Sequence, residues 1–458
     1  MTRKLNRRTF LKYSGIGLSA FAAGAVNLTC DKEAGEKPNI VIFVADDAGW
    51  KDVGYHGSEI HTPVIDLLAE EGVELDQFYV SPTCSPTRAS LLTGRYPSRF
   101  GILGPIAMRS TQALPKDAPT LAEWFHQHGY ETAITGKWHL GLRPEVGPNQ
   151  YGFDHAYGSL HGQIDQYTHR YKNGDKSWHR NGEFIDEEGH ATDLIADEAI
   201  RFIKNIRAKT KPFLLYVPFT VPHYPLQEEE KWIEPYNNKI ENESRKTFAA
   251  SMTHMDDAMG RILNTLDELK IADNTIVIFM SDNGGQKQWN PSFEYDLKHG
   301  PNDMLGNNSP LRGWKTDLYE GGIRVPAIIH WKGKLGSKKV NEVISVNDLF
   351  PTLASIAGIG TPDGAKIEGM NLESVLKQNE YLSKRVLYWR TRNQVALRKG
   401  DWKLIHNGET PVAGTSELYN LADDPYEEYD LANENMQIVE ELKKEMVNQF
   451  EMDAENKA

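Results

Sequence analysis

Three nearly uninterrupted apolar runs in the sequence predict strands that are buried on both faces. They cover residues 40–45, 213–219 and 275–280, and each is rich in β-branched and aromatic side chains. A strand with only one buried face would alternate apolar and polar residues, so continuous runs indicate a parallel sheet covered on both sides. Shorter runs predict further strands, at residues 73–80, 131–135 and 324–331.

Apolar residues spaced three and four apart predict helices between these strands. The clearest pattern covers residues 244–270, where Met252, Met255 and Met259 fall on one side, and we interpret this methionine stripe as core packing. Shorter helices are predicted at residues 63–71, 120–128, 191–208 and 348–356. Residues 141–190 show no clear periodicity, and a loop of this length in a compact domain is usually functional.

Beyond about residue 369 the pattern changes to short strands followed by one amphipathic helix. The strands are predicted at 386–390, 395–398 and 402–405, and the helix at 436–450. We therefore predict an α/β fold with a large mixed, mostly parallel sheet sandwiched by helices, and a small C-terminal antiparallel sheet plus a helix. The predicted domains cover residues 37–370 and 371–458.

Composition and charge restrict the kinds of partner. The 458 residues are 39% hydrophobic and 25% charged, as in ordinary globular proteins, and the formal net charge is -13. Nucleic acid binding needs a basic surface, so we predict no nucleic acid partner. The net charge does not exclude a small anion that is held in a locally basic pocket.

The first 30 residues predict an export signal and not a part of the fold. Arg7 and Arg8 precede a short apolar stretch at residues 13–26, a pattern that resembles a bacterial twin-arginine signal. We expect cleavage after the small residues 23–25 and release into the periplasm, with lipid anchoring at Cys30 as the alternative. The apolar stretch is short and glycine-rich, and no other segment is apolar enough for an integral membrane span.

Polar and ionisable side chains follow four of the predicted strands at their carboxyl ends. They are Asp46 and Asp47, Lys137 and His139, His223, and Asp282 and Asn283. Ligands of open α/β sheets bind outside the carboxyl ends of the strands. Four strands that each deliver such groups therefore predict one convergent site.

The carboxylate and amide groups of this set suit a hard cation. They offer only oxygen ligands, which fit Ca²⁺ or Mg²⁺ better than zinc. Either pair alone could equally be a helix cap or a turn, but two pairs after two long buried strands favour a metal site. Further side chains supply positive charge or proton transfer, namely Arg88, Lys137, His139, His223 and Lys315. Together these groups describe a pocket for a sulfate or phosphate ester.

Cys84 is one of only two cysteines in the chain, and Cys30 lies at the edge of the export signal. Cys84 therefore has no internal disulfide partner, and it is either a buried structural thiol or a chemical group. Pro86 suits the first turn of a helix that continues to residue 93. This predicts that Cys84 lies just before a helix N-terminus, where negative charge is favoured.

The segment around this cysteine carries a motif of twelve residues, which reads Cys84-Ser85-Pro86-Thr87-Arg88-Ala89-Ser90-Leu91-Leu92-Thr93-Gly94-Arg95. It resembles the signature of the formylglycine-dependent sulfatases, a family of the alkaline phosphatase superfamily, and departs from it only at Thr87, where Ser or Ala is usual. Further motifs follow in the family's order, at residues 136–141, 222–223, 281–285, 313–315 and 320–326. The whole pattern is most similar to arylsulfatase A and N-acetylgalactosamine-6-sulfatase relatives, which implies an alkaline phosphatase-like fold.

The resemblance implies a role for each site residue. Cys84 would be converted to formylglycine, whose hydrate attacks sulfur, forms a covalent sulfated intermediate and then expels sulfate. The implied metal, Ca²⁺ with Mg²⁺ as the alternative, is held by Asp46, Asp47, Cys84 (as formylglycine), Asp282 and Asn283. His223 would contact the substrate and protonate the leaving alcohol, and His139 would help the hydrate to expel sulfate. Lys137 and Lys315 would bind sulfate oxygens, and Arg88 would hold the formylglycine.

The resemblance also implies a substrate and a second enzyme. The substrate would be a sulfated saccharide, from a glycosaminoglycan or an algal polysaccharide, and formylglycine requires a formylglycine-generating or anaerobic sulfatase-maturing enzyme. Candidate sugar contacts are His161, Gln163, His169, Arg170, Trp178, His179, Arg390 and Arg392. Two alternatives stay open: a phosphodiesterase or phosphonate monoester hydrolase on the same scaffold, and an inactive protein that binds sulfated sugar.

Overall fold

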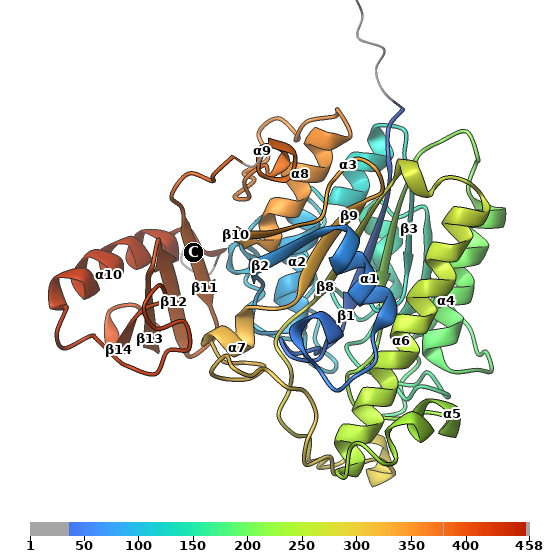
Figure 1. The fold of residues 1–458 in the computed structure, drawn as a ribbon, viewed down its shortest axis with the longest axis horizontal. Helices are drawn as coiled ribbons and strands as arrows, with labels where there is room; N and C mark the ends of the chain where they lie inside the picture. Colours follow the sequence, from blue (N-terminus) through green and yellow to red (C-terminus); the bar gives the residue numbers. More distant parts are fainter. Residues whose placement is uncertain (1–35, 379, 455–458) are drawn as a thin grey trace, which may run out of the picture. The chain divides into compact units, whose positions relative to one another are not determined.

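The computed structural model describes residues 36–378 and 380–454, so the predicted export signal lies outside the described part of the chain. The main feature of this part is a ten-stranded sheet (Figure 1). From edge to edge its strands are β10 (Lys338–Ser345), β2 (Val73–Tyr79), β9 (Ala327–Trp331), β8 (Thr275–Ser281), β1 (Asn39–Ala45), β7 (Phe213–Pro218), β3 (Glu131–Thr135), β4 (His155–Ser159), β5 (Trp178–Arg180) and β6 (Glu183–Phe184).

Most neighbouring strands of this sheet run parallel. β1 pairs in parallel with β7 and β8, and the parallel arrangement continues from β7 through β3 to β4. β9 runs antiparallel between β2 and β8, and β5 and β6 complete one edge in antiparallel pairs. The prediction of a large mixed, mostly parallel sheet is therefore confirmed.

Helices cover both faces of the sheet because its central strands are apolar on both sides. In β1, Val41 and Phe43 pack in one core with α1, α4 and α6, whereas Ile40 and Ile42 pack in a second core with α2, α3, α8 and α9. The helices are α1 (Pro63–Glu71), α2 (Cys84–Thr93), α3 (Leu121–Gln127), α4 (Ala191–Arg201), α5 (Glu230–Ile233), α6 (Glu243–Glu268), α7 (Glu320–Ile323), α8 (Leu349–Ile356), α9 (Glu373–Gln378) and α10 (Met436–Glu451). The methionines of α6 lie in the first core, as core packing requires.

Two parts of the large sheet differ from the sequence-based expectation. Residues 141–190 contain β4, β5 and β6 and are not only loop. The edge strand β10 was also not expected, because it alternates buried and exposed positions irregularly. β5 and β6 are too short to give a sequence pattern, and β10 at the edge has no continuous apolar run.

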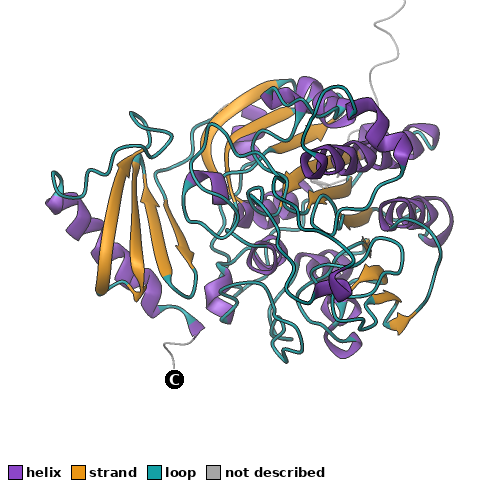
Figure 2. Ribbon diagram, turned by 90° about the horizontal axis from the view of Figure 1, so that it is seen from below, coloured by secondary structure: helices purple, strands orange, loops and turns teal. Residues whose placement is uncertain are grey.

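A four-stranded antiparallel sheet follows in the chain and packs against α10 (Figure 2). Its strands are β11 (Val386–Arg390), β12 (Gln394–Lys399), β13 (Trp402–Thr410) and β14 (Ala413–Asn420). On its other face, apolar residues of this sheet pack against Tyr79, Leu318 and Ile323. The small C-terminal sheet plus helix is confirmed, and the exact domain boundaries stay predictions.

A buried ionic cluster connects the two sheets. Nζ of Lys403 in β13 lies 2.9 Å from Oε1 of Glu320 in α7 and 2.8 Å from Oε1 of Glu427. The hydroxyl of Tyr79 donates to Oε2 of Glu320 at 2.7 Å, and the three charged side chains are at most 1% exposed. Because α7 ends the segment that carries Lys315, the cluster anchors that segment to the C-terminal sheet.

Among residues 36–378 and 380–454, no helix combines the length and the apolar character that crossing a membrane would require.

Candidate active site

Four adjacent strands of the large sheet deliver the polar groups to one place. β8, β1, β7 and β3 are neighbours, and all four run parallel. Asp46 and Asp47 follow β1, and Asp282 and Asn283 follow β8 directly. The chain places these groups together because the carboxyl ends of parallel strands meet at one edge. The convergence that the sequence predicts is therefore present in the structure.

Three carboxylates and one amide form the centre of the site. The side-chain amide of Asn283 donates to Oδ1 of Asp47 at 2.8 Å, and the backbone N–H of Asp47 donates to Oδ1 of Asp282 at 3.2 Å. Asp47 has a φ of 78°, a strained conformation for a residue with a side chain. All four side chains are buried, at 0–2% exposure.

Three cationic side chains neutralise these carboxylates. Lys137 Nζ lies 2.6 Å from Oδ2 of Asp46, and Lys315 Nζ lies 2.7 Å from both carboxylate oxygens of Asp47. Arg88 donates to Oδ2 of Asp282 through Nη2 at 2.7 Å and through Nε at 3.2 Å.

Arg88 also joins this centre to the backbone that follows β3. Its Nη1 donates to the carbonyl of Lys137 at 2.9 Å. The guanidinium is 1% exposed and therefore holds two of the strand ends in a fixed relation.

The oxygen-rich centre fits a divalent cation. Oδ1 of Asp46 and Oδ1 of Asn283 are buried and have no hydrogen-bond partner, although an unpaired buried oxygen is costly. Burial raises the pKa of Asp46, and the charges of Asp282 and Asp47 raise it further against the attraction of Lys137. A hard cation such as Ca²⁺ or Mg²⁺ would satisfy both oxygens and offset this repulsion.

Cys84 lies in the first turn of α2, against the large sheet. Its side chain is buried, and burial raises the pKa of its thiol in spite of the charges of Lys137 and Lys315. The expectation that the helix N-terminus favours a negative charge at Cys84 stays a prediction, and burial acts against it for the unmodified thiol. Pro86 is the third residue of this helix, so the helix begins earlier than predicted.

His139 directs its Nδ1 atom toward Cys84. Nε2 of the imidazole lies 3.2 Å from the carbonyl of Ile106, to which it donates, so Nδ1 is left as an acceptor 3.2 Å from Sγ of Cys84. Burial, together with Lys137 and Arg88, lowers the pKa of this imidazole well below its usual range. Gly162 lies against the ring, and a Cβ there would be 2.2 Å from Cε1 of His139. His139 is therefore a neutral acceptor directed at position 84.

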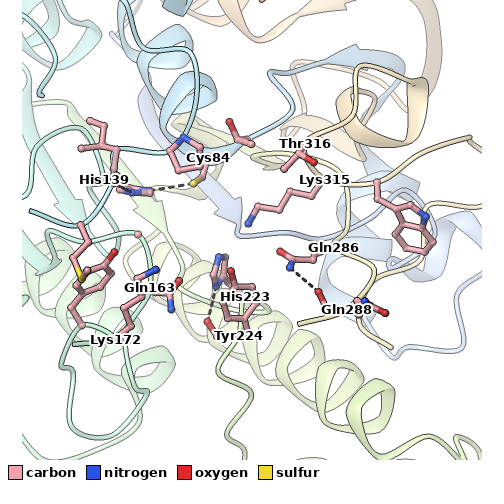
Figure 3. A pocket seen from close by; sticks show the side chains of 18 of the residues that line it. Cys84, His139, Gln163, Lys172, His223, Tyr224, Gln286, Gln288, Lys315 and Thr316 are labelled. Carbon is pink, nitrogen blue, oxygen red and sulfur yellow. Dashed lines mark hydrogen bonds between the residues drawn. The ribbon is translucent and has the colours of Figure 1, made fainter. Parts of the chain in front are cut away.

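His223 lies across the cavity from Cys84 and His139 (Figure 3). Its Nδ1 donates to the carbonyl of Tyr224 at 2.6 Å, and its Nε2 lies 3.7 Å from Oδ2 of Asp47. Burial and then the charge of Lys315 lower the pKa of this imidazole well below its usual range. The free nitrogen of His223 thus faces the space beside the carboxylates.

A cavity of about 900 Å³ opens above Cys84, His139, His223 and Lys315. This volume lies near the upper end of the range for ligand pockets. Its outer wall consists of amide, aromatic and lysine side chains, which include Gln163, Tyr171, Lys172, Tyr224, Gln286, Gln288, Phe293 and Trp314. Most of these residues lie in loops that show no hydrophobic periodicity in the sequence. The sequence indicated only those within residues 141–190, through the concentration of polar and aromatic side chains there.

The candidate sugar contacts are only partly in this wall. Gln163 lines the cavity, whereas His169 stacks on Trp178 in the interior with ring centroids 4.7 Å apart. Arg390 does not line the cavity, because its Nη1 pairs with Asp453 at 2.9 Å. The remaining four candidates, His161, Arg170, His179 and Arg392, also lie outside the lining.

Comparisons with known proteins agree with this geometry. The family model "Sulfatase" matches residues 38–359, and the model "N-sulphoglucosamine sulphohydrolase, C-terminal" matches residues 313–453. Mouse arylsulfatase J is 31% identical over 89% of this chain and 74% of its own length. Mouse N-acetylgalactosamine-6-sulfatase is 32% identical over 87% of this chain and 75% of its own length.

A solved structure shares both the fold and a comparable level of identity. The crystal structure of Ps i-CgsB in complex with k-i-k-neocarrahexaose has a TM-score of 0.82 and 31% sequence identity, over 92% of this chain and 94% of that chain.

Proposed function

The chain belongs to the sulfatase family, and we propose that it removes sulfate from a sulfated carbohydrate in the cavity around Cys84. It is a sulfuric ester hydrolase. The observation that carries the proposal is the meeting of Cys84, His139, His223 and two lysines around one group of buried carboxylates. These side chains come from separate segments of the chain, and the fold brings them together.

Two groups that the family uses fit the residues present. Cys84 would be the precursor of formylglycine, and Asp46, Asp47, Asp282 and Asn283, together with position 84, would hold Ca²⁺ or Mg²⁺. When bound, these groups would supply an aldehyde hydrate as nucleophile and a positive charge that polarises the sulfate ester. The two buried oxygens without partners support this assignment.

The other side chains around the cavity have separate roles in the reaction. Nδ1 of His139 can accept a proton from the group at position 84, because its other nitrogen donates to a carbonyl. Lys137 and Lys315 place ammonium groups beside the carboxylates, where they can hold sulfate oxygens. Arg88 orients both α2 and Asp282.

His223 would protonate the leaving group. Its Nε2 faces the cavity, and burial keeps the ring neutral while the cavity is empty of anions. A sulfate ester beside Nε2 adds negative charge there and favours a proton on that nitrogen, which can then pass to the departing alcohol.

The outer wall of the cavity supports a carbohydrate as the alcohol part of the ester. Amide side chains such as Gln286 and Gln288 can bond sugar hydroxyls, and aromatic side chains such as Tyr224 and Trp314 offer flat apolar faces. The solved relative that carries a bound saccharide and the relatives named after a sugar sulfate support the same class. A phosphodiesterase or phosphonate hydrolase and an inactive sugar-binding protein are not favoured.

A substrate panel tests the proposal. The chain is co-expressed with a formylglycine-generating or anaerobic sulfatase-maturing enzyme, and sulfate release is measured from sulfated saccharides and compared with phosphate release from matched esters. We expect sulfate release that is lost in Cys84→Ser and retained in Arg392→Ala, because Arg392 lies outside the cavity. Equal activity of the Cys84→Ser variant, or phosphate release that exceeds sulfate release, would reject the proposed function.

We also propose that the chain is exported through its twin-arginine segment to the periplasm. The support is the pair Arg7 and Arg8 before the apolar stretch at residues 13–26. Fractionation of cells that express the full chain tests this, with Arg7→Lys and Arg8→Lys together as the comparison. Export that persists in the double variant would contradict it, and a lipid on Cys30 would be visible in the mass of the exported protein.

A further inference from the structure

A second cluster of potential metal ligands lies outside the cavity around Cys84. His190 precedes the first turn of α4, Glu228 lies between β7 and α5, and His254 lies within α6. Each offers one ligand atom, and the three atoms lie within 4.8 Å of one another. Figure 1 shows α4 beside α6, with α5 at one end of α6. None of the three residues lines the cavity of the active site.

The cluster is buried and incompletely bonded. The three side chains are 0–1% exposed. Oε1 of Glu228 has no hydrogen-bond partner and lies 3.7 Å from Nε2 of His190, and Nε2 of His254 has only Oδ2 of Asp193 near it, at 3.4 Å. A buried carboxylate oxygen without a donor is costly, so its presence beside two imidazoles indicates a missing ligand.

The donor set determines the chemical class of that ligand. Two imidazole nitrogens and a carboxylate are the ligands of Zn²⁺ and similar transition metals, whereas Ca²⁺ and Mg²⁺ prefer oxygen alone. We propose that His190, Glu228 and His254 bind a transition-metal ion such as Zn²⁺, separate from the divalent cation of the active site. Asp193 stands 3.4 Å from Nε2 of His254 and can support that ring or complete the coordination.

A metal-free arrangement is the competing explanation. Nδ1 of His254 lies 2.8 Å from Oε2 of Glu228, and Nε2 of His190 donates to the carbonyl of Gln227 at 2.8 Å. Nδ1 of His190 accepts from the backbone N–H of Thr192 at 3.2 Å. Ligation through Nε2 of His190 would move its proton to Nδ1 and give up the bond to Thr192. The experiment must therefore separate a metal site from a buried ion pair.

A metal here would join three segments and reach toward the active site. Glu228 lies five residues after His223, in the same connection between β7 and α5. An ion that binds Glu228 to α4 and α6 would fix one end of the segment that carries His223. The ion would thus have a structural role and would not touch the substrate.

Metal analysis of the whole folded chain tests the proposal. The protein is stripped with a chelator, incubated with Zn²⁺, desalted, and analysed for metal per chain. We expect one equivalent of Zn²⁺ in the wild type and in Asp46→Asn, which alters the oxygen-rich centre. We expect loss of that equivalent in Glu228→Gln and in His254→Gln. His330→Gln is the matched control, because His330 also lies beside one carboxylate, Glu71 at 3.7 Å, but outside the cluster.

Two outcomes overturn the proposal. One is a wild type that keeps no stoichiometric Zn²⁺, and the other is a cluster variant that is folded and keeps it. If the cluster variants do not fold, Co²⁺ in the wild type decides the matter. Co²⁺ that is bound by the two imidazoles with a low coordination number should absorb visible light intensely, and added Zn²⁺ should abolish this absorption by displacing it. A spectrum like that of hydrated Co²⁺ would show that the cluster is only an ion pair.

Discussion

Replacement of Lys403 by methionine should destabilise the whole folded unit. Methionine keeps most of the side-chain volume but removes the ammonium group that bridges Glu320 and Glu427, which lie 2.9 and 2.8 Å from Nζ. Removal of one partner from a buried ion pair leaves an uncompensated charge and costs about 3–5 kcal/mol. The described residues from Lys37 onward form one compact unit, so the loss should appear in a single transition.

The expected shift follows from the size of that unit. Unfolding entropy is roughly 2 cal/mol/K per residue, or about 0.9 kcal/mol/K for a unit of this length, so the loss lowers Tm by about 3–6 °C. Thermal unfolding followed by circular dichroism measures it. Lys399→Met is the control, because Lys399 forms an exposed pair with Glu441 at 2.7 Å and should leave Tm unchanged.

A double variant separates charge from packing. Addition of Glu320→Gln to Lys403→Met removes one of the two carboxylates that lose their ammonium partner, and it should recover part of the lost Tm. A Tm for Lys403→Met that equals the wild-type value would refute the reasoning. So would a double variant that is less stable by the sum of both single losses.

Three further predictions concern the active site and the response to pH. Gly162→Ala should lower kcat about 100-fold with an unchanged far-ultraviolet spectrum, because the new Cβ displaces the ring of His139; an unchanged kcat would show that this ring position is not needed. Burial, with a contribution from His155, lowers the pKa of His179 from 6.5 to about 4, so the folded state binds fewer protons than the unfolded state between these pH values. The wild type should therefore lose stability relative to His179→Gln as the pH falls below 6.5, by about 2 kcal/mol at pH 5 in urea titrations, and parallel curves would contradict this. Dialysis against a chelator of divalent cations should lower sulfate release, and Ca²⁺ or Mg²⁺ should restore it; activity that survives complete removal would exclude a cation at the oxygen-rich centre.

The centre of the fold and of the site could be predicted because both depend on local sequence patterns. β1 and β8 are apolar on both faces, and this continuous pattern is specific for a central parallel strand. The polar groups that end these strands must then meet at one edge. Asp47 and Asp282, 235 residues apart in the sequence, therefore lie in contact as expected.

The rest of the cavity depends on tertiary packing, which no local pattern encodes. Gln286 and Trp314 reach the cavity from loops whose course is set by their contacts with other segments. Lys403 looks in the sequence like one more surface lysine, and only the packing of the two sheets reveals its buried partners. Within residues 141–190, β5 and β6 escaped prediction because they have only three and two residues, and β4, His-Ala-Tyr-Gly-Ser, has no β-branched residue.

The burial of Cys84 has a consequence for how the protein can be produced. The side chain is 2% exposed and lies 3.2 Å from Nδ1 of His139 in the lining of the cavity, so we expect a folded chain to offer an enzyme no access to its Cβ–Sγ bond. We therefore expect the proposed formylglycine to be made on the nascent chain, before α2 packs against the sheet. A host without a maturing enzyme would yield soluble, correctly folded and inactive protein, and later addition of that enzyme would not rescue it.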